Sequence, residues 1–130
     1  MPDLTGIATR EAINVKYMIM MFGTAGEMME TKSPEWIREM IGFMVGIDGD
    51  LRERGELVFN AGLADGSAAK LVRADGTVTD GPFAEAKESL IGFWVVDVES
   101  EARVTELAAS IAYWSDVVEV RPLGEEPPEV

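Results

Sequence analysis

Residues 80–98 read DGPFAEAKESLIGFWVVDV, a tight corner and a charged run that lead into the most apolar strand predicted in the chain. Asp80, Gly81 and Pro82 favour a rigid turn, because Asp accepts hydrogen bonds from nearby backbone, Gly bends freely and Pro fixes φ. From Leu90 to Val98 the side chains on both alternating faces are largely apolar. This period predicts a strand that is covered on both sides of its sheet.

Other segments with a period of two are also predicted to be strands. Val15 to Phe22 is apolar on both faces, so it too is expected to be covered on both sides. Val117 to Arg121 alternates valine with charged residues, as expected of an edge strand with one face in water. The remaining predicted strands are Leu57 to Leu63 and a hairpin of Ala69 to Ala74 with Thr77 to Thr79, around the tight-turn dipeptide Asp75-Gly76.

Two helices are predicted from cap residues and from apolar residues at helical spacing. Ser33 and Pro34 start a helix that runs to about Arg54 and ends at Gly55. Ser100 caps a second helix from Glu101 to about Trp114. A face of small residues on the first helix either lets another backbone approach closely or weakens a solvated surface. These residues are Gly42, Gly46 and Gly49.

The order strand, helix, strand, hairpin, strand, helix, strand predicts an α+β fold, an antiparallel sheet with two helices on one face. Two helices cover one face only, so the second apolar face needs a partner. We therefore predict a homodimer in which two sheets face each other. The domain is expected over residues 15–123, between an N-terminal extension, 1–14, and an acidic, proline-rich tail, 124–130, that is predicted to be disordered.

The composition of the 130-residue chain excludes several classes of function. Its 24 acidic and 11 basic residues give a formal net charge of −13, which repels nucleic-acid phosphates and anionic membranes. Without histidine or cysteine, Ser-His-Asp triads, Cys-His pairs and imidazole or thiolate metal ligands are absent. The acidic residues have no recognised calcium-loop spacing, so no metal is expected. No cofactor is predicted either. No signal peptide or membrane span is visible, and we expect a cytoplasmic protein.

Three segments carry a resemblance to a known family: Lys16-Tyr17-Met18, DGPFAEAKE at residues 80–88, and Val118-Glu119-Val120-Arg121-Pro122. On these segments the chain resembles DGPF-domain proteins of the YCII-related family over about residues 15–123. The resemblance implies a ferredoxin-like dimeric α+β barrel and supplies no established activity. The His/Asp pair assigned to catalysis in the YCII branch has no counterpart here. Some DGPF relatives are joined to, or encoded near, extracytoplasmic-function sigma factors, which suggests regulation through a protein partner.

The charged run after the corner is the candidate site. Carboxylates beside an ammonium group can share a proton or hold a polar ligand, because neighbouring charge and desolvation decide which form is favoured. The candidate catalytic residues are Asp80, Glu85, Lys87 and Glu88, and the candidate apolar walls of a ligand cleft are Tyr17, Met18, Phe83 and Trp94. In the structural alternative, Asp80 forms the turn and the Glu/Lys alternation is a local ion-pair network.

Methionines at strand and helix periods also admit two interpretations, an adaptable ligand cavity or an ordinary core. They are Met18, Met20 and Met21 in the first strand and Met40 and Met44 in the first helix. Two functional hypotheses follow. The first is a small-molecule enzyme or binding protein that uses a cleft, and the second is a noncatalytic dimeric module that binds another protein. The sequence identifies no reaction.

Overall fold

The computed structural model describes residues 15–23, 30–81 and 89–124. Four strands form one sheet: β1 (Val15–Gly23), β2 (Leu57–Gly62), β5 (Ser89–Val98) and β6 (Val118–Pro122). Their order is β2-β5-β1-β6, and each neighbouring pair is antiparallel. The two strands that are apolar on both faces, β1 and β5, are therefore the central ones, and β6 is the edge strand that its alternation predicts.

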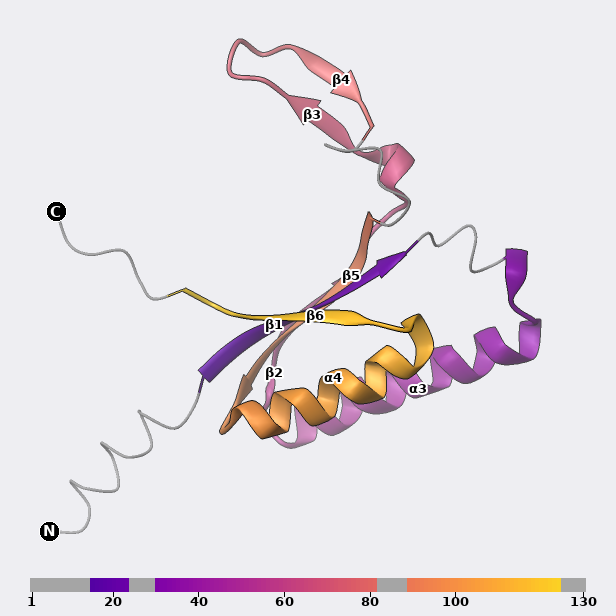
Figure 1. Cartoon of the computed structure of the whole chain (residues 1–130), viewed down its shortest axis with the longest axis vertical. Coiled ribbons are helices and arrows are strands. Elements are labelled where there is room, and N and C mark those ends of the chain that lie inside the picture. The colour runs from indigo at the N-terminus through magenta and orange to yellow at the C-terminus, as the bar shows by residue number, and fades with distance from the viewer. Residues whose placement is uncertain (1–14, 24–29, 82–88, 125–130) are drawn as a thin grey trace, which may run out of the picture.

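Two helices, α3 (Pro34–Glu53) and α4 (Glu101–Ser115), lie on the same side of this sheet (Figure 1). The predicted caps are confirmed, since the hydroxyl oxygens of Ser33 and Ser100 each accept a hydrogen bond of 3.1 Å from a backbone N–H three residues on. Gly55 follows α3 with φ +72°, a left-handed conformation that glycine adopts at little cost. Neither described helix combines the length and the hydropathy that crossing a membrane requires.

The chain order β1-α3-β2-β5-α4-β6 and the strand order β2-β5-β1-β6 together define a ferredoxin-like α+β fold. The core lies between the sheet and the two helices, where burial of apolar area supplies most of the stabilisation. Its most deeply buried side chains are Ile19, Leu51, Val96, Val98, Val104 and Ile111. The expected α+β architecture is therefore confirmed for a single chain.

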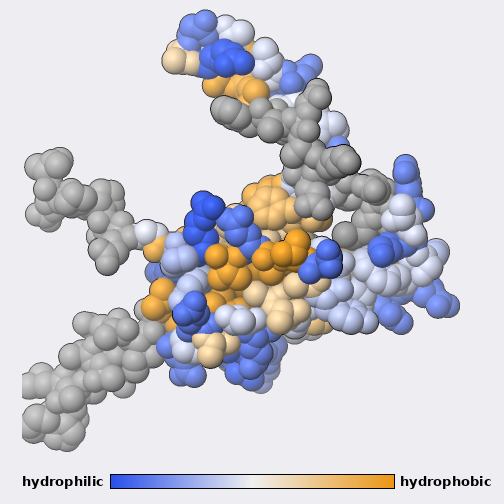
Figure 2. Space-filling model, in the orientation of Figure 1, coloured by the Kyte–Doolittle hydropathy of each residue, from blue (hydrophilic) through white to orange (hydrophobic). Residues whose placement is uncertain are grey.

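The opposite face of the sheet is apolar at its centre, and no described helix covers it. Successive side chains of a strand point to opposite faces, so the burial of Ile19 against the helices places its neighbours on the open face. The apolar residues of this open sheet face are Met18, Met20, Phe59, Phe93 and Val95. The rings of Phe59 and Phe93 lie 5.9 Å apart between centroids. Figure 2 looks onto the edge of the sheet, with apolar side chains gathered at the position of β6 in Figure 1 and polar ones around them.

A small second sheet is formed by β3 (Lys70–Val72) and β4 (Val78–Asp80), which follow the short 3-10 helix η1 (Gly66–Ala68) and project away from the main sheet (Figure 1). Gly76 has φ +90° in the turn between the two strands, and Asp75 accepts a 2.9 Å hydrogen bond from the Thr77 N–H. The predicted hairpin around Asp75-Gly76 is confirmed, because both residues supply the turn chemistry that they favour.

One nearly buried arginine links three elements. The Arg103 guanidinium, near the start of α4, donates three hydrogen bonds of 2.7–3.3 Å to the carboxylate of Glu56, directly before β2. It also pairs with Glu106 at 2.7 Å and lies 3.8 Å from Asp50 of α3. The planar guanidinium suits such a multidentate contact. This cluster therefore ties α4, α3 and the entry to β2 together.

Three glycines of α3 present an open surface. A Cβ atom added at Gly42, Gly46 or Gly49 would meet no described atom within 4 Å. Within the described part of the chain, therefore, no other backbone packs against this helix face.

Candidate functional site

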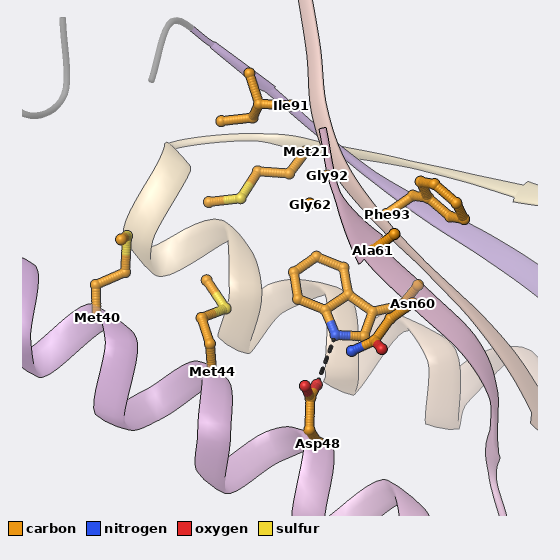
Figure 3. A pocket seen from close by; sticks show the side chains of 11 residues that line it. Met21, Met40, Met44, Asp48, Asn60, Ala61, Gly62, Ile91, Gly92 and Phe93 are labelled. Carbon is orange, nitrogen blue, oxygen red and sulfur yellow. Dashed lines mark hydrogen bonds between the residues drawn. The ribbon is translucent and has the colours of Figure 1, made fainter. Parts of the chain in front are cut away.

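A cavity of about 450 Å³ lies between α3 and the helix-facing side of the sheet (Figure 3). The volume falls within the range of small-molecule sites, about 300–1,000 Å³. The described lining residues come from β1, α3, β2 and β5 and are mainly apolar: Met21, Met40, Met44, Asp48, Asn60, Ala61, Gly62, Ile91, Gly92, Phe93 and Trp94. Ala61 and Phe93 pair with each other one position from Asn60 and Trp94, so their side chains lie on the open sheet face.

Two facing glycines explain why the sheet leaves space here. Gly62 of β2 pairs with Gly92 of β5, and Met21 of β1 pairs with Gly92 from the other side. In the next row towards the core, Asn60 pairs with Trp94, whose side chain is buried on the helix-facing side. Since residues two apart share a face, both glycines stand where side chains would otherwise fill the space below α3. A Cβ atom at Gly62 would meet no described atom within 4 Å.

The opposite wall comes from a single line of residues on α3. Met40, Met44 and Asp48 are spaced four residues apart, which places them one above another on the same helix face. Figure 3 shows both methionine side chains projecting from the helix towards the sheet, with Met21 and Ile91 on the far side of the cavity. Methionine is flexible and polarizable, so this wall can adapt to ligands of different shape.

The polar end of the cavity is held by a hydrogen bond. The indole Nε1 of Trp94 donates to Oδ1 of Asp48 at 3.1 Å, the dashed line in Figure 3. No Lys or Arg of the described ranges forms an ion pair with Asp48. Asn60 is the other polar residue in the lining. The cavity thus has an apolar body and a carboxylate that a buried tryptophan orients.

The predicted apolar walls do not share one surface. Trp94 lines the cavity, whereas Tyr17 packs against the core on the helix side and Met18 lies on the open sheet face. Tyr17 and Met18 are successive residues of one strand, so they must point to opposite faces. Phe83, the fourth predicted wall, lies outside the described residues.

Of the predicted catalytic residues, only Asp80 is described. Its exposed carboxylate forms an ion pair with Lys70 across the hairpin, and it lines neither this cavity nor a second one of about 370 Å³ between α3 and α4. The next residue, Gly81, has φ +97° and donates a 2.8 Å hydrogen bond to the Ala69 carbonyl oxygen, which continues the pairing of β3 with β4. The other three candidates, Glu85, Lys87 and Glu88, lie outside the described residues.

Sequence reasoning missed the polar end of the cavity. Asp48 follows Met40 and Met44 at helical spacing, so a carboxylate on the flank of an apolar stripe was the available signal. The sequence carried no signal for the facing pair of Gly62 and Gly92, because their pairing depends on strand register. Within the described ranges, no three acidic side chains lie close enough together to hold a metal ion.

Comparison with known proteins places the chain in a family. No curated protein matches the sequence. The family model of the YCII-related domain matches residues 16–126, which include both described helices and nearly every residue of the six strands. The match extends over most of the 130 residues. The chain therefore belongs to the YCII-related family.

Proposed function

We propose that the protein binds a small, largely apolar molecule in the cavity between α3 and the sheet. The observation that carries the proposal is the described lining itself, which has three methionines and a buried tryptophan, with two polar residues at one end. Such a ratio of apolar to polar groups is typical of ligand sites. Asp48 is the one titratable group among the lining residues that the structure describes, so these residues contain no acid–base pair. We therefore propose binding and assign no reaction to the cavity.

A glycine substitution tests this proposal without removing any existing contact. Gly62→Leu places a side chain into the cavity, where a Cβ atom meets no described atom within 4 Å. Gly49→Leu is the matched control, because its Cβ is equally unobstructed and Gly49 does not line the cavity. The probe is 3-phenylpropanol, a neutral molecule with one apolar and one polar end.

Calorimetric titration and thermal unfolding would measure the interaction. A ligand at ten times its dissociation constant stabilises the native state by about 1.4 kcal/mol. We expect the probe to stabilise the wild type and Gly49→Leu, and to have no effect on Gly62→Leu. Equal binding to both variants would place the site elsewhere, and no binding to the wild type would contradict the proposal.

We also propose that two copies associate through their open sheet faces. The support is the row of apolar side chains on that face, which no described helix covers, together with the apolar character of β1 and β5 on both sides. Large exposed apolar patches generally mark interfaces. Burial of the face in a homodimer would remove this surface from water.

Sedimentation of a matched pair of valine variants tests the dimer. Val95 lies in the centre of the open sheet face, whereas Val78 is exposed on the hairpin. Val95→Lys is expected to sediment as a monomer, because burying an unpaired ammonium group in an interface is costly. Val78→Lys is expected to remain dimeric. A monomeric wild type, or a dimeric Val95→Lys, would exclude this interface.

The charged run remains a separate proposal, a catalytic or ligand-orienting role for Asp80, Glu85, Lys87 and Glu88. Asp80→Asn in the probe titration tests the ligand-orienting part, because a changed affinity would connect the run to the cavity. If the protein dimerises and binds no probe, the result supports the alternative proposal, a noncatalytic cytoplasmic module that binds another protein. A sigma factor is one candidate for that partner.

A further inference from the structure

We infer that the cavity between α3 and the sheet prefers an organic cation, an amine with an apolar body whose ammonium group pairs with Asp48. This inference rests on the proposed binding function and adds the chemical class of the ligand. It is carried by the charge of the lining, the orientation of the carboxylate and the arrangement of apolar residues along α3.

The charge of the cavity is negative and has no partner in the described part of the chain. Of the described lining residues, Asp48 is the one with a formal charge. The carboxylate of Asp50, two residues on, does have ion-pair partners, since it lies 3.4 Å from the guanidinium of Arg54 and 3.8 Å from that of Arg103. No described Lys or Arg pairs with Asp48. A partly buried carboxylate gains most from a cation that can also donate hydrogen bonds to it.

The carboxylate is already oriented for such a contact. The Trp94 Nε1 donates to Oδ1 of Asp48, and Trp94 itself is buried, so the acceptor is held in place. The other oxygen, Oδ2, accepts no hydrogen bond from the residues that the structure describes. An ammonium group has several donors and can use Oδ2 together with the Asn60 side chain, the second polar group of the lining.

The line of residues on α3 sets the shape of the ligand. From Met40 to Asp48 the helix advances eight residues, which corresponds to about 12 Å at 1.5 Å per residue. The charged group lies at one end of this line, and both methionines lie towards the other. The matching ligand is therefore an elongated amine with its charge at one end.

Anionic ligands are disfavoured on the same grounds. No lysine or arginine is among the described residues that line the cavity, so a carboxylate or phosphate would meet Asp48 there without a compensating charge. The formal net charge of −13 also attracts cations and repels anions over a longer range. The long-range effect is common to every surface site, whereas the contact with Asp48 is local, and variants can separate the two.

Three probes with one skeleton test the inference: 3-phenylpropylamine, 3-phenylpropanol and 3-phenylpropanoate, titrated calorimetrically at neutral pH. We expect the amine to bind the wild type about tenfold more tightly than the alcohol, because both can donate a hydrogen bond to the Asp48 carboxylate and the ammonium group adds Coulomb attraction to it. The carboxylate is expected to bind more weakly than the alcohol. An amine that binds no better than the alcohol would overturn the inference.

Two isosteric variants assign the preference to one residue. Asp48→Asn is expected to bind amine and alcohol equally, whereas the control Asp50→Asn is expected to keep the preference, since Asp50 lies outside the cavity lining. A preference that persists in Asp48→Asn would overturn the assignment. Alcohol binding without amine preference in the wild type leaves the proposed function intact and removes only the inference. No binding of either probe removes both.

Discussion

Replacing Arg103 with methionine is expected to lower the free energy of unfolding by about 3–4 kcal/mol, although the residue lies outside the candidate cavity. Its guanidinium donates three hydrogen bonds to Glu56. Methionine keeps much of the apolar stem and removes the charge, so the variant mainly leaves the Glu56 carboxylate without its partner. The prediction tests whether this cluster stabilises the junction of α3, α4 and β2.

The expected loss of unfolding free energy follows from how little the Arg103 and Glu56 side chains are exposed to water. The Arg103 and Glu56 side chains are 12% and 14% exposed. Breaking a buried pair costs about 3–5 kcal/mol, and the remaining access of water to Glu56 favours the lower end of that range. Glu106 and Asp50 are 74% and 51% exposed, so their ion pairs with Arg103 add roughly 0–1 kcal/mol each.

Urea unfolding at neutral pH would measure the change. Hydrogen bonding by Glu56, assisted by Coulomb attraction from Glu56 and Glu106, raises the pKa of Arg103 above its ordinary value. A group whose pKa is raised on folding contributes its stabilisation below its unfolded pKa, so Arg103 remains charged and its contribution is constant throughout the neutral range. The slope of the unfolding curve should be unchanged, because the surface exposed on unfolding is nearly the same.

The double variant Arg103→Met with Glu56→Leu supplies the control. Removing both charges leaves no unpaired group, so its stability is expected within about 1 kcal/mol of the wild type. Two results would refute the reasoning. One is a loss below about 1 kcal/mol in Arg103→Met, which would mean that water solvates Glu56 fully. The other is a double variant as unstable as the sum of its two single variants, because additivity would exclude an interaction between them.

Three further predictions concern single residues. Asp116, after α4, has φ +77°, a backbone conformation that glycine adopts at less cost. Asp116→Gly is therefore expected to raise the free energy of unfolding, measured in urea, by about 1 kcal/mol, and a lowered value would contradict this. The Thr77 N–H lowers the pKa of the Asp75 carboxyl, so this contact stabilises the hairpin above the ordinary Asp pKa and is lost as pH falls through the lowered value. A carbon NMR titration midpoint at or above the ordinary value would exclude that contact. Ser33→Ala and Ser100→Ala should each cost about 1 kcal/mol in urea unfolding, and unchanged midpoints would show that water replaces both caps.

Local features of the fold were predictable from the sequence because they depend on nearby residues. Ser33 and Ser100 cap helices through hydrogen bonds that span three residues, and Asp75-Gly76 forms its turn within the hairpin. The two-faced apolar pattern of β1 and β5 identified strands that are central in the sheet. Strand order is a long-range property that periodicity does not contain, and the ferredoxin-like order was expected from the family resemblance.

The candidate site was less predictable because it depends on register. The cavity opens where Gly62 meets Gly92, thirty positions apart in the chain, and a one-residue shift would turn either glycine to the other face. The methionines could be assigned to core or cavity only with this register known. The structure gives Met21 both roles, since it is buried in the core and lines the cavity.

The connection between β2 and β5 begins and ends at one place in the sheet. Gly62 pairs with Gly92, and the N–H of Leu63 donates a 2.8 Å hydrogen bond to the carbonyl oxygen of Ile91. The pairing of β2 with β5 is thus complete without the hairpin, and β3 and β4 form an insertion between two strands that are already hydrogen-bonded to each other. Changes of length within the insertion cost the scaffold little, because the loop-closure term grows only slowly with length. Gly62, Ile91 and Gly92 also line the cavity, so changes within the insertion alter the chain next to the cavity while the scaffold stays constant.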